Sequence, residues 1–337
     1  VPSRWLYRMT SLLDGLRGDQ NGDKALAEMR ARGREWQLLA QALDKPEKPI
    51  APMTRPSPCP PIEVRPKLLS VTEIQTLIRD PYAIYAKHVL RLTALDPLRP
   101  TPDPRLRGTI IHRVFQEFSL ATKSGLPSDA VDLLLSIADD VFAEEIPWPA
   151  TRRIWRARLA RNAKWFVETE GARRKMATPT HFETKGHIPI PNTPVAIKGT
   201  ADRIDVAVDG QLIIYDYKTG APPSANVIQN FDKQLLIEAA MAENGGFNDT
   251  GPSPVSALVY IGLARTPKEQ NIDLTKHSVS DVWDGLSELI GQYQSLTKGY
   301  TSRRAMQKEA DERDFDHLAR FHEWDVSDAS DPQVVTK

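Results

Sequence analysis

Two aspartates and a lysine occupy a stretch with the pattern of a β-hairpin, between residues 199 and 220. Asp202 lies just before the first of two apolar runs, and Asp216 and Lys218 follow the second. Because side chains alternate between the two faces of a strand, Asp216 and Lys218 project to the same side. Carboxylates are ligands for hard divalent cations such as Mg²⁺, and an ammonium group stabilises negative charge on a phosphate. The stretch therefore contains the residue types that a metal-assisted reaction at a phosphate group requires.

The turn between the two predicted strands decides whether both carboxylates share a face. A two-residue loop at Asp209-Gly210 would send them to opposite faces. A three-residue loop that ends at Gly210, with this glycine in the left-handed conformation, pairs Ala207 with Gln211 and sets the two carboxylates opposite each other. We predict the second register. On spacing alone, an exposed hairpin with solvated charges is the commoner interpretation.

Further motifs carry a resemblance to a known family. The chain contains, in this order, R-G-T-I-I-H (107–112), G-T-A-D-R-I-D (199–205), I-I-Y-D-Y-K-T-G (213–220), Q-L-L-I-E-A-A (234–240) and D-H-L-A-R-F-H-E-W (316–324). Together they resemble the RecB-type PD-(D/E)xK nucleases, and most of all the C-terminal nuclease domain of the B subunit of AddAB-type helicase-nucleases. The matching residues extend from about 70 to 324. The resemblance implies an α/β fold with an α-β-β-β-α-β core, a mixed sheet and helical additions.

The resemblance also implies roles for individual residues. It makes Asp202 and Asp216 ligands of Mg²⁺ or Mn²⁺, and it adds the backbone carbonyl of Tyr217. Lys218 then positions or deprotonates the attacking water and stabilises the phosphate charge. His112 is a further metal or phosphate ligand in this view, although a lone histidine on a partly apolar helix is more often structural.

Two more polar residues are candidates for the site. Gln234 matches the glutamine of the family motif, and we expect it to orient DNA or the catalytic lysine; an exposed helix face would show the same pattern. The tyrosine that commonly follows one turn later is replaced by Glu238. Glu183 lies on a predicted first strand, Thr180–Pro189, and is a candidate for the edge of the site.

A basic stretch precedes this strand. It carries four cations at roughly helical intervals, Arg153, Arg156, Arg161 and Lys164. Such a helix can follow a DNA backbone and neutralise its phosphates. An arginine-rich solvated face is an equally good interpretation. Because the stretch comes directly before the predicted catalytic sheet, we favour DNA binding.

The chain divides by composition into four parts. Residues 1–44 show helical periodicity over Trp5–Leu16 and Lys24–Leu43 and are expected to be a helical segment of a longer parent protein. Residues 45–67 are rich in proline and predict a stiff linker or a strap on a surface. Residues 68–325 form the predicted nuclease domain, and residues 326–337 are predicted to be disordered.

Three helices within the nuclease domain have clear signals. Ser70 followed by Glu73 indicates a helix start, and Asp80-Pro81 indicates its end. Later helices are expected over Phe231–Glu243 and Asp281–Gly299, with a buried strand over Val255–Leu263 between them.

Composition restricts the partners and cofactors. Forty-four acids balance 44 bases, so any DNA binding depends on local patches. The single cysteine, Cys59, excludes an all-cysteine metal site and fits a reducing cytosol, and no apolar run is long enough to span a membrane. Some relatives of the resembled family hold an iron–sulfur cysteine where this chain has Asp80, so we expect no cluster. We find no Walker-type ATP motif.

These observations predict a metal-dependent deoxyribonuclease, the nuclease module of a helicase-nuclease that processes DNA double-strand breaks. The expected partners are single-stranded DNA from unwound ends and a helicase-nuclease A-type subunit, and the expected location is the cytoplasm. A free-standing RecB-like exonuclease is one alternative. The other is a nuclease-fold module that binds DNA ends or assembles subunits without turnover.

Overall fold

The computed structural model describes residues 3–16, 18–48, 50–95, 97–306 and 313–335. The chain forms two compact units, Val1–Pro52 and Met53–Lys337. The first unit contains helix α1 (Arg4–Gly15), a short 3-10 helix (Gly18–Gln20) and helix α2 (Gly22–Asp44). Ser3 caps α1 by accepting a hydrogen bond from the Leu6 N–H. Both helices predicted for this segment are therefore present.

The second unit is built on a mixed sheet, in which six strands of the described residues take part. These strands are β2 (Leu68–Ser70), β3 (Ala177–Pro189), β4 (Ala196–Ala207), β5 (Leu212–Lys218), β6 (Val255–Gly262) and β7 (Lys268–Asn271). Strand β4 pairs antiparallel with β3 along its length, and its other edge pairs with β2 and β5. Strand β6 runs parallel to β5 and antiparallel to β7. The predicted α/β core with a mixed sheet is confirmed.

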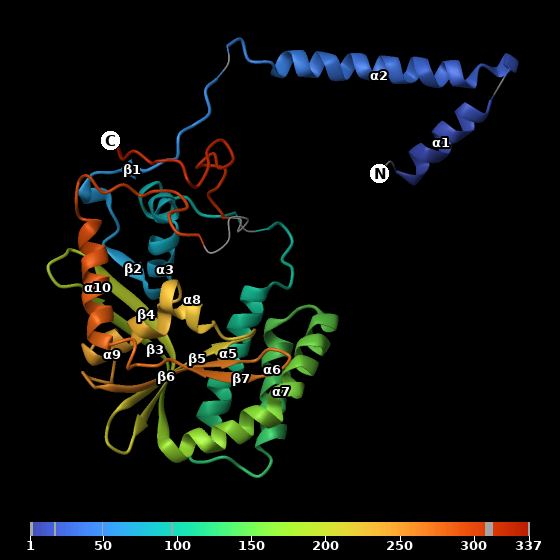
Figure 1. Ribbon diagram of the computed structural model, residues 1–337. Helices are drawn as coiled ribbons and strands as arrows, with labels where there is room; N and C mark the ends of the chain where they lie inside the picture. The colour runs from blue at the N-terminus through green and yellow to red at the C-terminus, as the bar shows by residue number, and fades with distance from the viewer. Residues whose placement is uncertain (1–2, 17, 49, 96, 307–312, 336–337) are drawn as a thin grey trace. The chain divides into compact units, whose positions relative to one another are not determined.

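Helices cover both faces of this sheet (Figure 1). One side carries α3 (Val71–Arg79), α4 (Pro81–Ile84), a π-helical turn (Tyr85–Val89), α8 (Ala225–Asn230), α9 (Gln234–Glu243) and α10 (Val279–Gln292). The other side carries α5 (Pro104–Ala121), α6 (Ala130–Glu145) and α7 (Pro149–Met176). Alternation along β5 produces two separate cores, because Ile214 packs in the first and Tyr215 in the second.

The start of α3 follows the predicted capping box. The Ser70 hydroxyl accepts the Glu73 N–H at 3.2 Å, and the Glu73 carboxylate accepts the Ser70 N–H at 2.8 Å. The helix ends at Arg79, and Pro81 opens α4, where its missing N–H is not needed.

The hairpin adopts the predicted register. Residue pairs Arg203–Tyr215 and Val206–Leu212 define the ladder, and the Ala207 N–H donates to the Gln211 carbonyl at 2.9 Å. Gly210 has a φ of +84°, which is the left-handed conformation expected for the three-residue loop. The same register, continued by one pair, places Asp202 opposite Asp216.

We expect Gly210→Ala to lower the free energy of unfolding by about 1–2 kcal/mol. A Cβ at this position meets open space, so the cost comes from the left-handed backbone and not from a clash. Urea denaturation measures it, with Gly285→Ala on α10 as the control, since that site is also open and has ordinary helical geometry. Equal destabilisation by both changes would contradict the role of the turn.

Two helix boundaries predicted from the sequence are wrong. The helix expected over Phe231–Glu243 begins only at Gln234, because Asp232 accepts hydrogen bonds from the Gln234 N–H and the Tyr260 hydroxyl and fixes a loop there. The helix expected to reach Gly299 ends at Gln292. Arg65, distant in sequence, donates to the Tyr293 carbonyl at 2.6 Å and holds the chain in turns beyond that point.

The last part of the proline-rich segment lies as a strap on the surface of the second unit. The C-terminal tail packs against this strap. Strand β1 (Pro58–Cys59) pairs in parallel with β8 (Gln333–Val334), and Arg55 donates to the Val326 carbonyl. The Tyr300 N–H donates to the Pro58 carbonyl at 2.9 Å. The prediction of a disordered 326–337 segment is therefore wrong for its described residues, 326–335. Sequence composition could not predict these distant partners.

Polar contacts surround Asp80, the residue directly before Pro81. The buried Asp80 carboxylate accepts the Arg303 N–H at 2.9 Å, and the Arg303 guanidinium binds both oxygens of Asp316 at 3.0 Å. This buried network ties the start of α4 to the C-terminal segment. In the part of the chain that the structure describes, no helix combines the length and the apolar character needed to cross a membrane.

Candidate active site

Three potential metal ligands converge from α5, β3 and β4. His112 Nδ1 lies 3.2 Å from Asp202 Oδ1, and His112 Nε2 lies 2.7 Å from the Tyr217 carbonyl oxygen. One ligand atom from each of His112, Glu183 and Asp202 falls within 4.8 Å of the others. Two carboxylates and an imidazole beside a backbone carbonyl form a donor set that fits a divalent cation.

Strand β3 places Glu183 at this group through the sheet register. Phe182 pairs with Arg203 and Thr184 pairs with Ala201, so Glu183 lies across from Asp202 on the neighbouring strand. Its φ of +47° is uncommon for a residue other than glycine, and such strain concentrates at functional sites. Burial raises the pKa of Glu183, and the charge of Asp202 raises it further. Glu183, predicted from the sequence at the edge of the site, thus lies within the group of candidate metal ligands.

A second group lies on the adjoining face of β5. Lys218 Nζ lies 2.9 Å from Asp216 Oδ2 and donates to the Gln234 side-chain oxygen at 3.1 Å. Gln234 Nε2 in turn donates to Asp216 Oδ1 at 2.7 Å. Gln234, at the start of α9, therefore fixes both the acid and the lysine. The alternative interpretation, in which Gln234 lies on an exposed helix face without a role in the site, does not apply.

The predicted cluster is consequently divided into two adjoining groups. Asp202 lies with His112 and Glu183, whereas Asp216 lies with Lys218 and Gln234. The two groups still interact electrostatically. Burial raises the pKa of Asp216 to about 7, and the negative charge of Asp202 in the other group contributes to that rise. Lys218 acts in the other direction and favours the ionised carboxylate.

The two basic side chains of the site both have raised pKa values. Burial lowers the pKa of Lys218, but the charge and hydrogen bond of Asp216, together with the charges of Asp232 and Asp202, raise it above its ordinary value. Burial also lowers the pKa of His112, and the hydrogen bond and charge of Asp202 raise it to about 9. A cation bound at His112 would therefore compete with a proton, which is usual for histidine ligands.

Tyr217 connects both groups to the core. Its N–H donates to Asp202 Oδ2 at 2.9 Å, and its carbonyl contacts His112. Its ring stacks on Phe115 with the centroids 4.9 Å apart, and its hydroxyl lies 3.5 Å from Arg203. Packing of this one side chain thus fixes the backbone on which Asp202 and His112 depend.

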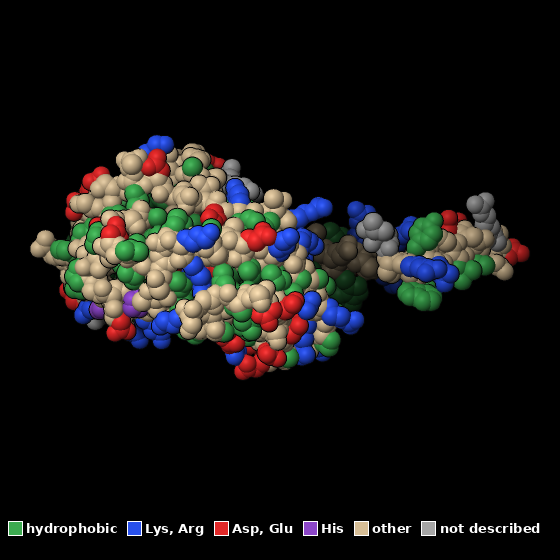
Figure 2. All heavy atoms as spheres, turned by 90° about the horizontal axis from the view of Figure 1, so that it is seen from below, with side chains coloured by type: hydrophobic (Ala, Val, Ile, Leu, Met, Phe, Trp, Pro, Cys, Tyr) green, Lys and Arg blue, Asp and Glu red, His purple; other side chains and the backbone are tan. Residues whose placement is uncertain are grey.

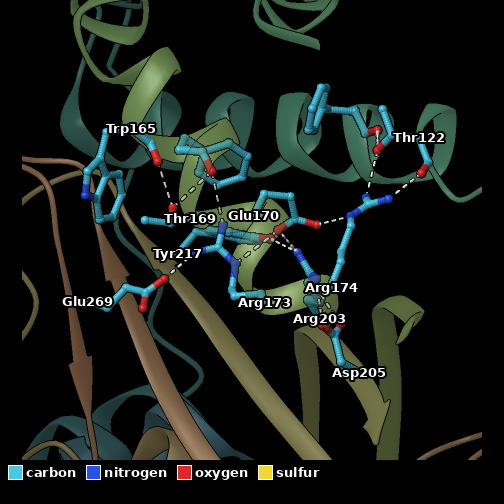
Figure 3. A network of polar contacts seen from close by, with 12 residues as sticks. Thr122, Trp165, Thr169, Glu170, Arg173, Arg174, Arg203, Asp205, Tyr217 and Glu269 are labelled. Atoms are coloured by element: carbon cyan, nitrogen blue, oxygen red, sulfur yellow. Dashed lines mark hydrogen bonds and ion pairs between the residues drawn. The ribbon is translucent and has the colours of Figure 1, made fainter. Parts of the chain in front are cut away.

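A buried ionic network lies behind Tyr217 (Figure 3). The Glu170 carboxylate of α7 accepts hydrogen bonds from Arg203 at 2.7 Å, Arg173 at 3.0 Å and Arg174 at 2.5 Å. Arg203 also binds both oxygens of Asp205 at 2.6 Å. Glu170 is 1% exposed and Arg203 is 0% exposed. The network therefore joins α7 to β4 directly beside Asp202.

Sequence reasoning missed this network. Arg203 and Asp205 alternate on one face of β4, which could have suggested a buried pair. Glu170 gave no signal, because it lies in an arginine-rich helix that has the composition of a solvated one. Only the packing of α7 against the sheet brings it to Arg203.

The four cations predicted to bind DNA do not form one group. Arg156 is paired with Asp139 at 3.1 Å, and Lys164 is 82% exposed with Glu168 at 3.9 Å. Arg161 faces a pocket beside the site, while Arg153 lies exposed elsewhere on α7. On the face seen in Figure 2, basic side chains are scattered among acidic and apolar ones and form no continuous band. A DNA path along this whole helix stays a prediction.

Comparison with known proteins establishes the class. The profile of the PD-(D/E)XK nuclease superfamily matches residues 68–328, which is more than half of the chain. The chain therefore belongs to the PD-(D/E)XK nuclease superfamily. The mixed sheet, with its hairpin at the centre and helices on both faces, is the corresponding fold.

Individual relatives are more distant. An uncharacterized protein of Rickettsia bellii (strain RML369-C) is 35% identical over 186 residues, which are 54% of this chain and 22% of that protein. An uncharacterized protein of Rickettsia felis (strain ATCC VR-1525 / URRWXCal2) is 33% identical over 204 residues, 58% of this chain and 24% of that protein. The B subunit of the ATP-dependent helicase/deoxyribonuclease of Streptococcus agalactiae serotype V (strain ATCC BAA-611 / 2603 V/R) is 28% identical over 211 residues, 61% of this chain and 18% of that protein. This chain thus spans about a fifth of the length of each relative.

Proposed function

We propose that this chain hydrolyses phosphodiester bonds of DNA with the help of Mg²⁺ or Mn²⁺. The convergence of His112, Glu183 and Asp202 beside the Asp216–Lys218 pair carries the proposal. Membership of the nuclease superfamily supports it. A bound divalent cation polarises the phosphate and lowers the pKa of a water molecule.

The protein groups have distinct roles in this proposal. His112, Glu183 and Asp202 hold the cation together with the Tyr217 carbonyl, and Asp216 completes the set from the adjoining group. The ammonium group of Lys218, held by Asp216 and Gln234, stabilises the negative charge that develops on the phosphate. Gln234 holds Lys218 and Asp216 in position, and Glu238 is its hydrogen-bond partner in the family's tyrosine position.

The biological setting is a further part of the proposal. Similarity to the B subunit of a helicase/deoxyribonuclease supports a nuclease module of a helicase-nuclease that processes double-strand breaks. Its substrate would be single-stranded DNA from unwound ends, and its partner would be a helicase-nuclease A-type subunit in the cytoplasm.

The test measures cleavage of labelled single-stranded DNA together with Mn²⁺ binding. We expect Mn²⁺ to support cleavage, EDTA to stop it, and Asp202→Asn to abolish it while weakening Mn²⁺ binding by at least about 10-fold, because a ligand and the hydrogen-bond partner of His112 are altered together. Asp209→Asn, an exposed aspartate at the hairpin turn, is the matched control.

Outcomes of this test separate the alternatives. Cleavage that persists in EDTA or in Asp202→Asn would contradict the proposed site. The unmodified chain could also bind DNA and Mn²⁺ without cleaving the DNA, whether it is alone or mixed with an A-type helicase subunit. In that case the module serves in binding or assembly only. Cleavage of free ends without any helicase would favour a free-standing exonuclease.

A further inference from the structure

A pocket of about 350 Å³ lies next to the candidate site, where α5 and α7 meet the carboxyl ends of β5 and β6. All of its charged side chains are arginines, and they come from three segments: Arg107 on α5, Arg158 and Arg161 on α7, and Arg265 after β6. None of the described residues that line the pocket is acidic. Its chemistry therefore suits an anion.

These arginines have no acidic partners among the described residues, unlike Arg156 of the same helix, which is paired with Asp139. Arg107 Nη2 donates to the Thr219 carbonyl at 3.2 Å, but its buried Nε has no hydrogen-bond partner in the described part of the chain. Burial and the nearby charge of Arg158 both lower the pKa of Arg107. Gathering like charges in this way is unfavourable unless an anion binds between them.

The pocket is attached rigidly to the candidate site. Thr219, which holds Arg107, directly follows Lys218, and the Leu263 N–H donates to the Lys218 carbonyl at 2.8 Å. The buried Asn162 side chain donates to the carbonyls of Leu263 and Ala264, at 3.1 and 3.0 Å, and so fixes the segment that precedes Arg265.

Spacing along α5 relates the pocket to a DNA strand. Arg107 precedes His112 by five residues, which is about 7.5 Å of helix. This short spacing lets one DNA strand contact the pocket and the candidate metal site at the same time. Guanidinium groups bind phosphate oxygens in a planar, bidentate manner that fits such a pocket.

We propose that this arginine pocket binds a phosphate group of the substrate strand close to the bond to be cleaved. The inference rests on the proposed function and adds the subsite that positions the strand. The phosphate is either the terminal phosphate of the strand or one of its internal phosphates.

The test is the salt dependence of binding to a fluorescent single-stranded oligonucleotide, measured by anisotropy in EDTA so that no hydrolysis occurs. For Arg107→Gln/Arg158→Gln we expect weaker binding and a plot of log K against log salt that is less steep by about 0.7 for each phosphate that the variant no longer binds. The matched control is Lys123→Gln/Lys276→Gln, which removes two exposed charges that lie outside the pocket and outside α7 and should leave the slope unchanged. Circular dichroism verifies that each variant is folded.

A second set of oligonucleotides identifies the phosphate. If the unmodified chain prefers a 5′- or 3′-phosphorylated end over a hydroxyl end, and Arg107→Gln/Arg158→Gln loses that preference, the pocket binds a terminal phosphate. If the end makes no difference but a neutral methylphosphonate at one internal position weakens binding to the unmodified chain alone, it binds an internal phosphate.

An unchanged affinity and slope in the folded Arg107→Gln/Arg158→Gln variant would overturn the pocket proposal. So would an equal change in the Lys123→Gln/Lys276→Gln control, which would indicate that the effect comes from the overall charge and not from the pocket. Because these measurements need no cleavage, a failure of the pocket and a failure of the nuclease activity can be told apart.

Discussion

Cleavage of single-stranded DNA by the Lys218→Met variant is expected to be about 10²–10³-fold slower than by the unmodified chain, while DNA binding is retained. The expected decrease in rate has this size because the variant lacks one fixed charge that stabilises the negative charge developing in the transition state. Methionine keeps most of the length of the side chain and removes the ammonium group that Asp216 and Gln234 hold in place. A loss confined to the cleavage rate identifies a group that acts in the transition state more than in the ground state.

Lys276→Met is the control for this experiment. Lys276 is 77% exposed, and its ion pair with Asp273 at 3.4 Å lies on the surface, so its removal should leave both binding and cleavage unchanged. Single-turnover cleavage with saturating enzyme measures the rate, and anisotropy in EDTA measures binding. Equal losses of binding and cleavage in Lys218→Met would instead assign Lys218 to DNA binding.

The Glu170→Gln variant is expected to lose about 3–5 kcal/mol of unfolding free energy at neutral pH. Three guanidinium groups, from Arg173, Arg174 and Arg203, are balanced by three carboxylates, from Glu170, Asp205 and Glu269. Removing the central acid leaves a positive charge uncompensated in a buried place, which is the costly way to break such a network. Urea denaturation monitored by circular dichroism measures the loss.

The pH dependence of this loss has a defined sign. Burial alone would raise the pKa of Glu170, but the charges of Arg203 and Arg173 and the hydrogen bonds of the arginines lower it to about 2 in the folded protein, from an ordinary 4.5. The stabilisation by Glu170 is therefore complete above about pH 5 and disappears as the pH falls towards 2. The stability difference between the unmodified chain and Glu170→Gln should shrink over the same range.

Glu168→Gln provides the control for the network. Glu168 lies two residues earlier on α7, is 65% exposed and has only a 3.9 Å ion pair with Lys164, so its loss should cost less than about 1 kcal/mol at any pH. A Glu170→Gln variant that is as stable as Glu168→Gln would show that the buried network contributes little.

Local features were predictable because few neighbours decide them. Asp209-Gly210 determined the three-residue turn through the left-handed conformation of Gly210, and the turn determined the register that places Asp202 opposite Asp216. The Ser70 and Glu73 capping box likewise fixed the start of α3. The family resemblance added His112 and Gln234 to the candidate site, which spacing alone did not.

Features that depend on distant partners were not predictable. The carbonyl groups bound by Arg65 end α10 early, and strand β1 orders the tail, although neither partner is near in sequence. The cations of α7 form one basic stretch in the sequence, yet packing pairs Arg156 with Asp139 and turns Arg161 toward a pocket shared with α5.

The sequence by itself determined the sheet class, the hairpin and the residue types of the candidate site. The tertiary structure alone decided how the acids are grouped, which arginines are paired, and that Glu170 is buried under the site. Backbone preferences and side-chain alternation act over a few residues, so they can be read from the order of the chain. The partner of a charge, and hence its role, depends on which segments fold against each other across the whole sheet.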